Sequence, residues 1–419
     1  MKKSLIIFGL LTFVILALAG CSSQPQKKEV VVMWWGDAYN AAFAQKLIDA
    51  YNATKPEVPA KLIAVPHQSY NSKLLSQAAS KTLPDIILLY PWDAQIMGSK
   101  AVLLPLNKYT DQQDFAQIKK DMWPRLLSAV TVNGNVYAVP IWTWSPGIYY
   151  NKDMFDAAGV EYPSKNWTWD EFIDKARKLT KKKNGRIVQY GLDSIDMGMG
   201  NFMLSYLVSN GGTFLSPDGT KCLLSEPKNI AILEKYFEME LKDGIAPKSS
   251  ARSNMTQDVF TANGAAMRIG GRDGIDVLTK RGMKFNWGAA PMPRGTKIVP
   301  FQTAMNLAIS ASTKYPDGAW AFVKFASGEP GQKVITQDRS DITVLKPLTY
   351  SKGFEEYKGR KDVNCMYRDM LIDSIPYPTL LNQWKSRIKD EFGLVEAGFK
   401  SVEKACQEIS REFKPAITK

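Results

Sequence analysis

Short, continuously apolar segments alternate with amphipathic ones near the start of the chain body, and this order constrains the fold more than any other feature. Apolar runs lie at residues 30–33 (Val-Val-Val-Met) and 86–89 (Ile-Ile-Leu-Leu), and a further strand is predicted at 61–65. Such runs are typical of strands buried on both faces. Between them, residues from about 40 to 56 and from 69 to 80 carry apolar side chains at helical spacing. The order strand, helix, strand, helix, strand predicts a parallel sheet with right-handed crossovers.

The middle of the chain predicts a second α/β unit. Strands are predicted at 187–192 and 265–269, and helices near 201–209 and 228–242. From about residue 351 to 413 the pattern is almost wholly helical. In a chain of 419 residues, these patterns indicate two domains with additional helices at the C-terminus.

Local signals define boundaries within these units. Asn133-Gly134, between two β-rich runs, is typical of a hairpin turn. Thr168 and Glu171 form a capping box that predicts a helix to about Lys181. The cluster Lys181-Lys182-Lys183, before Asn184-Gly185, is interpreted as a solvated turn.

The N-terminus has the order of a secretory signal: charged Lys2 and Lys3, an apolar run over residues 5–19, and small residues before Cys21. The run is too short and wrongly flanked for a stable membrane span. A cysteine at the cut point resembles the bacterial lipoprotein signal, in which Cys21 becomes the first residue and carries lipid. The alternative is an ordinary signal peptide with an incidental cysteine. Residues 1–20 are therefore expected to be removed, and residues 21–28 to tether the protein to the extracytoplasmic face of the cell membrane.

The net charge restricts the possible binding partners, and the few cysteines restrict the possible disulfides. The formal net charge is +13, and +11 without Lys2 and Lys3, which suits a protein lying against anionic lipid or a wall polymer. Nucleic acid is not an expected partner, because the charge is scattered and no groove-reading motif is present. Cys222, Cys365 and Cys406 leave two alternatives, a Cys365–Cys406 disulfide or buried free thiols.

The residue types needed for common catalytic centres are scarce. His67 is the single histidine, so a Ser-His-Asp or Cys-His centre would have to use it, and no G-x-S-x-G sequence accompanies it. The sequence has no histidine-rich metal motif and no acidic calcium loop. We therefore expect no catalytic residue, no cofactor and no metal. A carboxylate pair acting as in a glycosidase stays an open alternative, because Asp and Glu residues are numerous.

Tryptophan and aspartate occur together directly after predicted strands. Trp34-Trp35-Gly36-Asp37 follows the first strand, Tyr90-Pro91-Trp92-Asp93 follows the third, and Trp142-Thr143-Trp144 forms a further aromatic group. Ligands of open α/β sheets bind beyond the carboxyl ends of strands. Sugar rings present apolar C–H faces and hydroxyl edges, which match aromatic faces beside carboxylates. The pattern indicates a carbohydrate site at this edge; the alternative is that the tryptophans fill the core.

Ordered sequence blocks over essentially the whole mature chain resemble one family. They include Leu83-Pro84-Asp85-Ile86-Ile87, Tyr149-Tyr150-Asn151-Lys152 within 134–169, Ala290-Pro291-Met292-Pro293, and Ala308-Ile309-Ser310 followed by 316–325. Together they resemble the extracellular solute-binding proteins of carbohydrate-importing ABC transporters, a group that includes the maltose-binding proteins. The blocks are specific for the family and weak for the ligand.

This resemblance implies an α/β, two-lobe periplasmic-binding-protein-like fold. Each lobe would be a mostly parallel sheet flanked by helices, joined by a hinge, with extra helices at the C-terminus. Solute would bind in the cleft and close it. Residues 29–141 and 305–343 would form lobe 1, and residues 142–304 and 344–419 lobe 2. The ABC transporter permease in the membrane would be the protein partner, and the chain would be a monomer.

The resemblance also suggests ligand contacts, position by position. The candidates are Trp34, Gly36, Asp37, Tyr39, Trp92, Asp93, Trp142, Trp144, Asn201, Phe202, Gly271, Arg272, Asp273 and Trp384. Ala38 replaces a lysine that maltose-binding proteins carry beside the aspartate, which weakens the case for a maltodextrin. Arg272 departs from the aromatic residue usual in the family; it would contact sugar hydroxyls or a uronic acid carboxylate, or else form an internal salt bridge. Trp384 would stack on sugar or, alternatively, pack between helices.

These observations predict a lipid-anchored protein that captures a carbohydrate, an oligosaccharide rather than a monosaccharide. It would deliver this ligand to the permease and would not be an enzyme. Two alternatives stay open. One is a solute-binding protein for a non-sugar ligand such as a polyol phosphate or an organic acid, and the other is a surface-anchored glycoside hydrolase or lyase.

Overall fold

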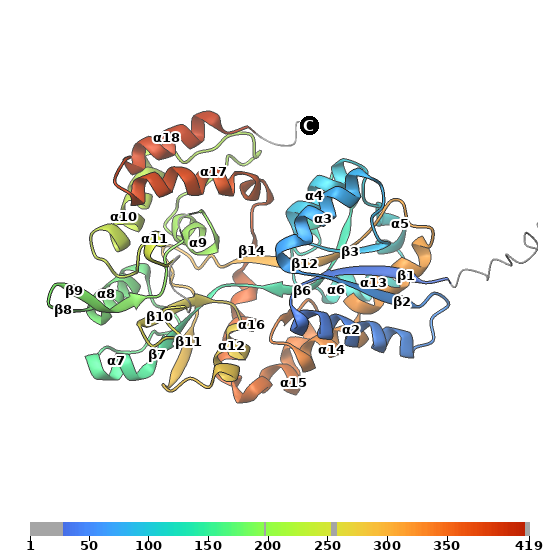
Figure 1. Cartoon of the computed structure of the whole chain (residues 1–419), viewed down its shortest axis with the longest axis horizontal. Helices are drawn as coiled ribbons and strands as arrows, with labels where there is room; N and C mark the ends of the chain where they lie inside the picture. The colour runs from blue at the N-terminus through green and yellow to red at the C-terminus, as the bar shows by residue number, and fades with distance from the viewer. Residues whose placement is uncertain (1–27, 197, 253–257, 415–419) are drawn as a thin grey trace, which may run out of the picture.

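The structure, a computed structural model, describes residues 28–196, 198–252 and 258–414. Within these ranges the chain forms two lobes, each built on its own sheet (Figure 1). None of the described helices combines the length and apolar character that a membrane span needs. The same ranges contain no cluster of three or more His, Cys, Asp or Glu side chains arranged to hold a metal ion.

The first lobe grows from the apolar runs that were predicted as buried strands. β1 (Val30–Trp35) pairs in parallel with β2 (Ala60–Val65) and β3 (Ile86–Leu89), and α2 (Ala38–Ala53) and α3 (His67–Ala79) connect these strands. The predicted alternation at the start of the chain body is therefore confirmed. Later segments complete a seven-stranded sheet, in the order β13-β6-β12-β3-β1-β2 with β14 beside β12: β6 (Ala138–Trp144), β12 (Phe301–Ile309), β13 (Ile342–Thr343) and β14 (Ile375–Pro376).

The second lobe is built on a five-stranded sheet in the order β11-β7-β10-β9-β8. Its strands are β7 (Gly147–Asn151), β8 (Lys181–Lys183), β9 (Arg186–Leu192), β10 (Ala265–Gly270) and β11 (Trp287–Ala290). Of the pairings in this sheet, only β9 with β10 is parallel. In the first lobe, β12 runs antiparallel to both β3 and β6. The two-lobe α/β fold is confirmed, but both sheets are mixed rather than mostly parallel, because late segments return into each sheet beside earlier ones.

Helices cover both sheets. The first lobe adds α4 (Pro91–Ser99), α5 (Asn107–Thr110), α6 (Gln113–Asp121), α13 (Pro316–Ser327) and α14 (Glu329–Asp338). The second lobe adds α7 (Lys152–Ala158), α8 (Trp169–Leu179), α9 (Asn201–Ser209), α10 (Pro227–Leu241), α11 (Ser249–Arg252) and α12 (Gly274–Arg281). The C-terminal region supplies α15 (Lys352–Glu355), α16 (Lys361–Asp373), α17 (Thr379–Glu396) and α18 (Val402–Glu412). α17 and α18 lie against the second lobe (Figure 1), and their buried side chains join its core.

Most local signals behave as predicted, with one correction. Thr168 and Glu171 form the capping box of α8, and Asn133-Gly134 turns between β4 (Thr131–Val132) and β5 (Asn135–Val136). The three lysines 181–183, however, form the exposed strand β8 rather than a turn. The turn is at Asn184-Gly185, whose φ angles of 52° and 75° allow a tight connection to β9.

The chain passes between the lobes more than once. β6 belongs to the first sheet and β7 to the second, and the chain returns between β11 and β12. The predicted lobe boundaries at 141/142 and 304/305 fall inside β6 and β12, and the exact partition stays a prediction. Cys222, Cys365 and Cys406 are free thiols, and no Cys365–Cys406 disulfide forms; Cys222 and Cys406 are buried as the second alternative stated, whereas Cys365 is half-buried.

Candidate ligand cleft

Aromatic residues meet at one edge of the first sheet. The carboxyl ends of β1 and β3 lie together because these strands are parallel. Trp35 ends β1, and Tyr90 and Trp92 follow β3. The ring centroids of Tyr90 and Trp92 are 4.5 Å apart with 12° between the ring planes, and those of Trp35 and Tyr90 are 6.3 Å apart at 21°. We call this set of three rings the aromatic stack.

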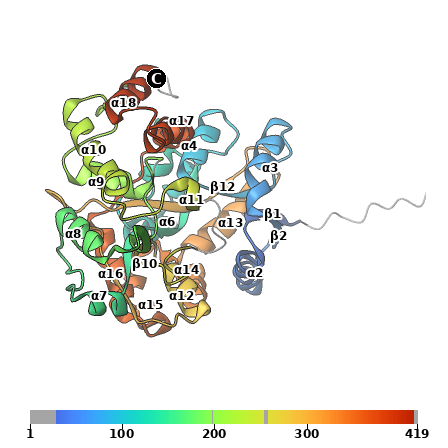
Figure 2. The ribbon, with the colours of Figure 1, turned by 60° about the vertical axis from the view of Figure 1, so that its left-hand side comes forward.

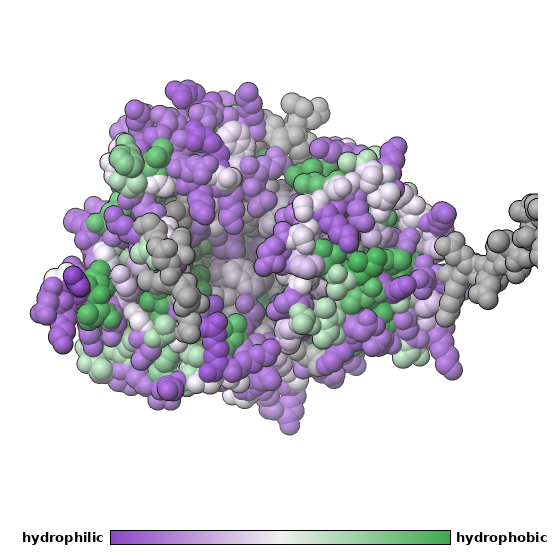
Figure 3. Space-filling view, in the orientation of Figure 1, coloured by the Kyte–Doolittle hydropathy of each residue, from purple (hydrophilic) through white to green (hydrophobic). Residues whose placement is uncertain are grey.

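A pocket of about 240 Å³ opens beside the aromatic stack. It is lined by Trp35, His67, Tyr70, Asn71, Leu88, Tyr90, Trp92, Asp93, Asn382 and Lys385. Asn382 and Lys385 belong to α17, so elements of both lobes bound the pocket. The Thr379 hydroxyl donates to Gln95 Oε1 over 2.6 Å and links α17 to α4, which lie side by side in Figure 2. Figure 3 shows the surface hollowed between the two lobes.

Hydrogen-bonding groups surround the apolar rings of this pocket. The indole N–H of Trp35 is buried and has no hydrogen-bond partner among the described residues. Amides of Asn71 and Asn382 and the exposed ammonium of Lys385 are also at the pocket. An aromatic face flanked by several donors and acceptors has the chemistry needed to hold a sugar ring by its C–H face and its hydroxyls.

Asp93 is the acidic group of the pocket. Burial raises the pKa of its carboxyl to about 6, although a hydrogen bond from the backbone of Tyr90 acts in the opposite direction. At neutral pH the group is mostly ionised and can accept hydrogen bonds from two hydroxyl groups. Below pH 6 it becomes protonated and loses part of this acceptor capacity.

A second polar group lies at the corresponding edge of the second lobe. Asp193 follows β9 and Gly271 follows β10, and these two strands are parallel, so both positions lie at one edge. An Arg268 nitrogen is 4.0 Å from an Asp193 oxygen, and another Arg268 nitrogen is buried without a hydrogen-bond partner among the described residues. Burial raises the pKa of Asp193 to about 7, with Arg268 opposing this shift. The Trp144 indole N–H donates to Asp273 Oδ1 over 2.8 Å.

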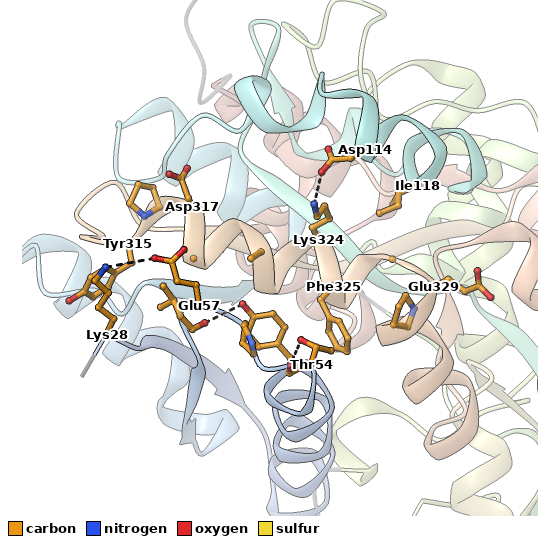
Figure 4. Close-up of a pocket in the computed structure, with 18 of the residues that line it drawn as sticks. Lys28, Thr54, Glu57, Asp114, Ile118, Tyr315, Asp317, Lys324, Phe325 and Glu329 are labelled. Atoms are coloured by element: carbon orange, nitrogen blue, oxygen red, sulfur yellow. Dashed lines mark hydrogen bonds and ion pairs between the residues drawn. The ribbon is translucent and has the colours of Figure 1, made fainter. Parts of the chain in front are cut away.

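A larger cavity, of about 740 Å³, lies on helices of the first lobe (Figure 4). It is lined by parts of α2, α6 and α13 and not by the ends of strands. Two ion pairs lie within the cavity, Lys324 with Asp114 and Lys28 with Glu57. The smaller pocket, where strand ends, aromatic faces and both lobes meet, is therefore the candidate ligand site.

Residues 36–333 match the family described as bacterial extracellular solute-binding protein, and this match covers most of the chain. The chain belongs to this family. The solute-binding protein is 24% identical over 376 residues to the multiple sugar-binding protein of Streptococcus mutans, covering 83% of this chain and 86% of that protein. It is 28% identical over 206 residues to the lactose-binding protein of Rhizobium radiobacter, covering 48% of this chain but only 46% of that relative.

Solved structures share the fold. An ABC substrate-binding protein from Listeria monocytogenes, in complex with cycloalternan, superposes on the solute-binding protein with a TM-score of 0.82 and 21% sequence identity. The superposition covers 92% of this chain and 98% of that one. At this identity the likeness establishes the two-lobe architecture.

Several predicted contact residues of the solute-binding protein lie at the two sheet edges described above, one in each lobe. Trp92 and Asp93 line the pocket. Trp144, at the end of β6 in the first sheet, lies against Gly271 and Asp273 of the second lobe, and a Cβ atom on residue 271 would come within 1.8 Å of its indole nitrogen. Asn201 begins α9, and its side-chain oxygen is buried without a hydrogen-bond partner among the described residues.

Three other candidates, Trp34, Trp142 and Phe202, are core residues; for the two tryptophans this is the alternative stated above. Trp34 is 1% exposed and packs on Trp142, with ring centroids 5.5 Å apart, and Phe202 is buried in the core of the second lobe. Trp34 shares a strand face with Val30 and Val32, so it points inward and its neighbour Trp35 faces the pocket.

The loop after β1 initiates α2 and does not line the pocket. Asp37 Oδ1 accepts hydrogen bonds from the backbone N–H of Asn40 at 3.0 Å and from its side chain at 2.9 Å. Gly36 has a φ of +136°, and a Cβ atom there would lie 2.3 Å from that of Asn40. The Lys280 ammonium lies 3.6 Å from the ring centroid of Tyr39 and covers that ring. These contacts give the predicted residues Gly36, Asp37 and Tyr39 structural partners within the protein.

Arg272 is an internal residue. It is 1% exposed, and its guanidinium donates to Asn364 Oδ1 at 2.8 Å and to the carbonyl oxygens of Asp341 at 3.1 Å and Phe354 at 3.2 Å. Burial lowers its pKa to about 10. The prediction of a sugar or uronic acid contact is therefore wrong for this side chain. The side chain is internal, as the alternative stated, but its acceptors are carbonyl and amide oxygens, and the described residues show no salt bridge of Arg272.

Trp384 packs between C-terminal segments. Its ring centroid is 5.2 Å from that of Phe413, and its indole N–H donates to the Lys414 carbonyl at 3.3 Å. Asn382 and Lys385, three residues apart and therefore on one helical face, are the α17 residues at the pocket. This placement favours the helix-packing alternative. Cys21 lies outside the described residues.

Proposed function

We propose that the solute-binding protein captures a carbohydrate in the cleft between its lobes as the substrate-binding component of an ABC importer. The observation that carries this proposal is the aromatic stack, with Asn71, Asp93 and Lys385 beside it. Aromatic faces with adjoining hydrogen-bonding groups suit sugar rings better than they suit a small organic acid. The sugar-binding names of the relatives and the cycloalternan of the Listeria structure support a saccharide ligand, and an oligosaccharide in particular.

The remaining features of the proposal concern location and partners. Cys21 would carry the lipid that holds the chain at the extracytoplasmic face of the cell membrane, and residues 21–28 would be the tether. A membrane permease would accept the ligand from the closed form, and the chain would act as a monomer without chemical turnover. The signal-like N-terminus and the family membership support these statements.

Tryptophan fluorescence tests the proposal directly, because Trp35 and Trp92 line the pocket. The mature chain, with Cys21→Ser to prevent lipidation, would be titrated with neutral and acidic mono- and oligosaccharides. We expect a saturable change at micromolar concentrations of an oligosaccharide, with no sugar consumed. Silence over the whole panel would favour a non-sugar solute, and consumption of a sugar would favour the glycoside hydrolase or lyase.

A further inference from the structure

The β8–β9 hairpin concentrates positive charge at one end of the molecule. Lys181, Lys182 and Lys183 form β8, and Arg186 begins β9 after the two-residue turn. All four side chains are exposed. Figure 1 shows this hairpin at one end of the longest axis and the N-terminal end of β1 at the other.

These four cations lack ion-pair partners among the described residues, whereas three other cations of the same lobe have them. Lys178 pairs with Asp174 at 2.7 Å, Arg177 with Asp243 at 2.6 Å, and Lys242 with Glu238 at 3.7 Å. Within the hairpin, Lys183 lies directly opposite Arg186 in the ladder. Like charges at opposed positions destabilise a strand pair. The hairpin therefore carries a repulsion that an external anionic surface would relieve.

An apolar side chain accompanies the charge. Val188 on β9 is 58% exposed, and Figure 3 shows hydrophobic atoms directly beside the hydrophilic end of the molecule. Basic residues next to exposed aliphatic ones are characteristic of segments that bind at the surface of anionic membranes.

We infer that the β8–β9 hairpin is a second membrane contact, which binds the headgroups of anionic phospholipids while the lipid on Cys21 holds the opposite end. The inference rests on the proposed anchor for its role in the cell. The seven residues from Cys21 to Lys27 reach at most about 25 Å when extended, so the body stays near the bilayer. Anchoring raises the effective concentration of the hairpin at the surface, so a contact that is weak in solution becomes significant. Because the tether leaves the first lobe and the hairpin belongs to the second, both lobes would be held at the membrane.

Vesicle co-sedimentation tests this inference without the anchor. The mature chain with Cys21→Ser would be mixed, at low salt, with vesicles of phosphatidylglycerol and phosphatidylcholine or of phosphatidylcholine alone. The hairpin variant carries Lys181→Gln, Lys182→Gln, Lys183→Gln and Arg186→Gln. A matched control replaces four exposed second-lobe lysines that have no ion pair among the described residues: Lys165→Gln, Lys221→Gln, Lys228→Gln and Lys235→Gln.

We expect the parent and the control to bind the anionic vesicles with similar affinity and the hairpin variant to bind at least tenfold more weakly. Binding to phosphatidylcholine alone should be negligible, and added salt should weaken the anionic binding. No binding by the parent, equal losses in both variants, or no loss in the hairpin variant would each overturn the inference. Binding to a soluble polyanion such as poly(glycerol phosphate), without vesicle binding, would also overturn it.

The unfolding temperature and the sugar affinity of each variant are measured separately from vesicle binding. The hairpin variant should unfold at the same or a higher temperature than the parent, since its Lys183–Arg186 repulsion is removed. Its sugar affinity should equal that of the parent, because the hairpin does not line the pocket. A failure of sugar binding in every variant would count against the proposed function and not against the membrane contact.

Discussion

At the scale of single residues, Trp34 and Trp35 show how one strand assigns opposite roles to adjacent identical side chains. Trp34 packs against Phe43 and Trp142 in the core, while Trp35 stacks on Tyr90 at the pocket. The difference follows from the alternation of side chains along a strand, and not from residue type. Position on a helix separates residues in the same way. Asn382 and Lys385 share the face of α17 that lines the pocket, whereas Trp384 lies on another face.

Removing one ring of the aromatic stack tests the site. Trp92→Ala should weaken oligosaccharide binding by about 1–3 kcal/mol, the range for a buried aromatic anchor, and should leave the fold intact. Trp384→Ala is the matched control, since this ring packs on Phe413 and should leave the affinity unchanged. Calorimetric titration of both variants measures the effect. Equal affinities of parent and Trp92→Ala would show that the ligand lies elsewhere.

The raised pKa of Asp93 predicts a pH dependence of binding. Affinity should fall as the pH decreases through about 6, because the carboxylate becomes protonated and loses acceptor capacity. Asp93→Asn should bind weakly at every pH and lose this transition. A parent affinity that stays flat between pH 5 and 8 would exclude Asp93 from ligand contact.

Ionisation of Asp93 should favour ligand binding, but it should lower the stability of the folded chain. Its pKa is about 6 in the folded chain, above the value of 3.8 expected when unfolded, so the folded state favours the protonated form. The parent therefore loses stability as the pH rises from about 4 to 6. Asp93→Asn should be more stable above pH 6, by about 1 kcal/mol after allowance for partial solvent exposure, and equally stable below pH 4. Denaturant unfolding at pH 4 and pH 8 compares the two.

At the scale of secondary-structure elements, Arg272 joins segments that are distant in the sequence. Its three hydrogen bonds connect the turn after β10 to the segment before β13, the end of α15 and the first turn of α16. Phe354 also lies under the guanidinium, with its ring centroid 4.0 Å away. The planar group satisfies three acceptors in different directions at once, which an ammonium on a flexible chain does not reproduce.

Arg272→Lys should therefore lower the free energy of unfolding by about 2 kcal/mol, because buried carbonyl oxygens lose their donors. The ratio of affinities for acidic and neutral sugars should not change, since the side chain is buried away from the cleft. Chemical unfolding and competitive titration give the two readouts. A selective loss of acidic-sugar binding would return Arg272 to the ligand site.

Gly271 allows the close approach of Trp144 to the turn after β10. A Cβ atom there would lie 1.8 Å from the indole nitrogen and 2.4 Å from Asp273 Oδ1. Gly271→Ala should displace the indole, reduce stability by about 1–3 kcal/mol and weaken sugar binding. Gly393→Ala is the control, because a Cβ atom on this α17 residue meets nothing within 4 Å and should stabilise the helix. Thermal unfolding of the two variants should shift in opposite directions.

At the scale of the whole molecule, contacts between α4 and α17 join the two lobes beside the pocket. A ligand shifts a two-state equilibrium only through interactions that differ between the states. The hydrogen bond from Thr379 to Gln95 forms where these helices meet, so it stabilises an arrangement in which both lobes reach the pocket. Removing this hydrogen bond should lower the affinity for the ligand, although neither of its two residues lines the pocket.

Thr379→Val should weaken ligand binding by about 1 kcal/mol, the contribution of a typical hydrogen bond. Thr349→Val is a matched control, because the Thr349 hydroxyl donates to the Lys346 carbonyl within its own turn. Small-angle scattering with and without ligand should show a larger unliganded radius for Thr379→Val only. Identical affinities for the two variants would mean that this bond does not contribute to closure.

The sequence by itself determined the order of elements, the first parallel strands, the family resemblance and the position of Trp92 and Asp93 at a strand end. Each of these depends on periodicity, caps or motifs that are local in the chain. The tertiary structure decided which tryptophan faces the pocket, that Arg272 is internal, that late strands enter the sheets antiparallel, and that Asn382 and Lys385 join the aromatic stack. These outcomes depend on contacts between residues far apart in the sequence, whose packing overrides local preference.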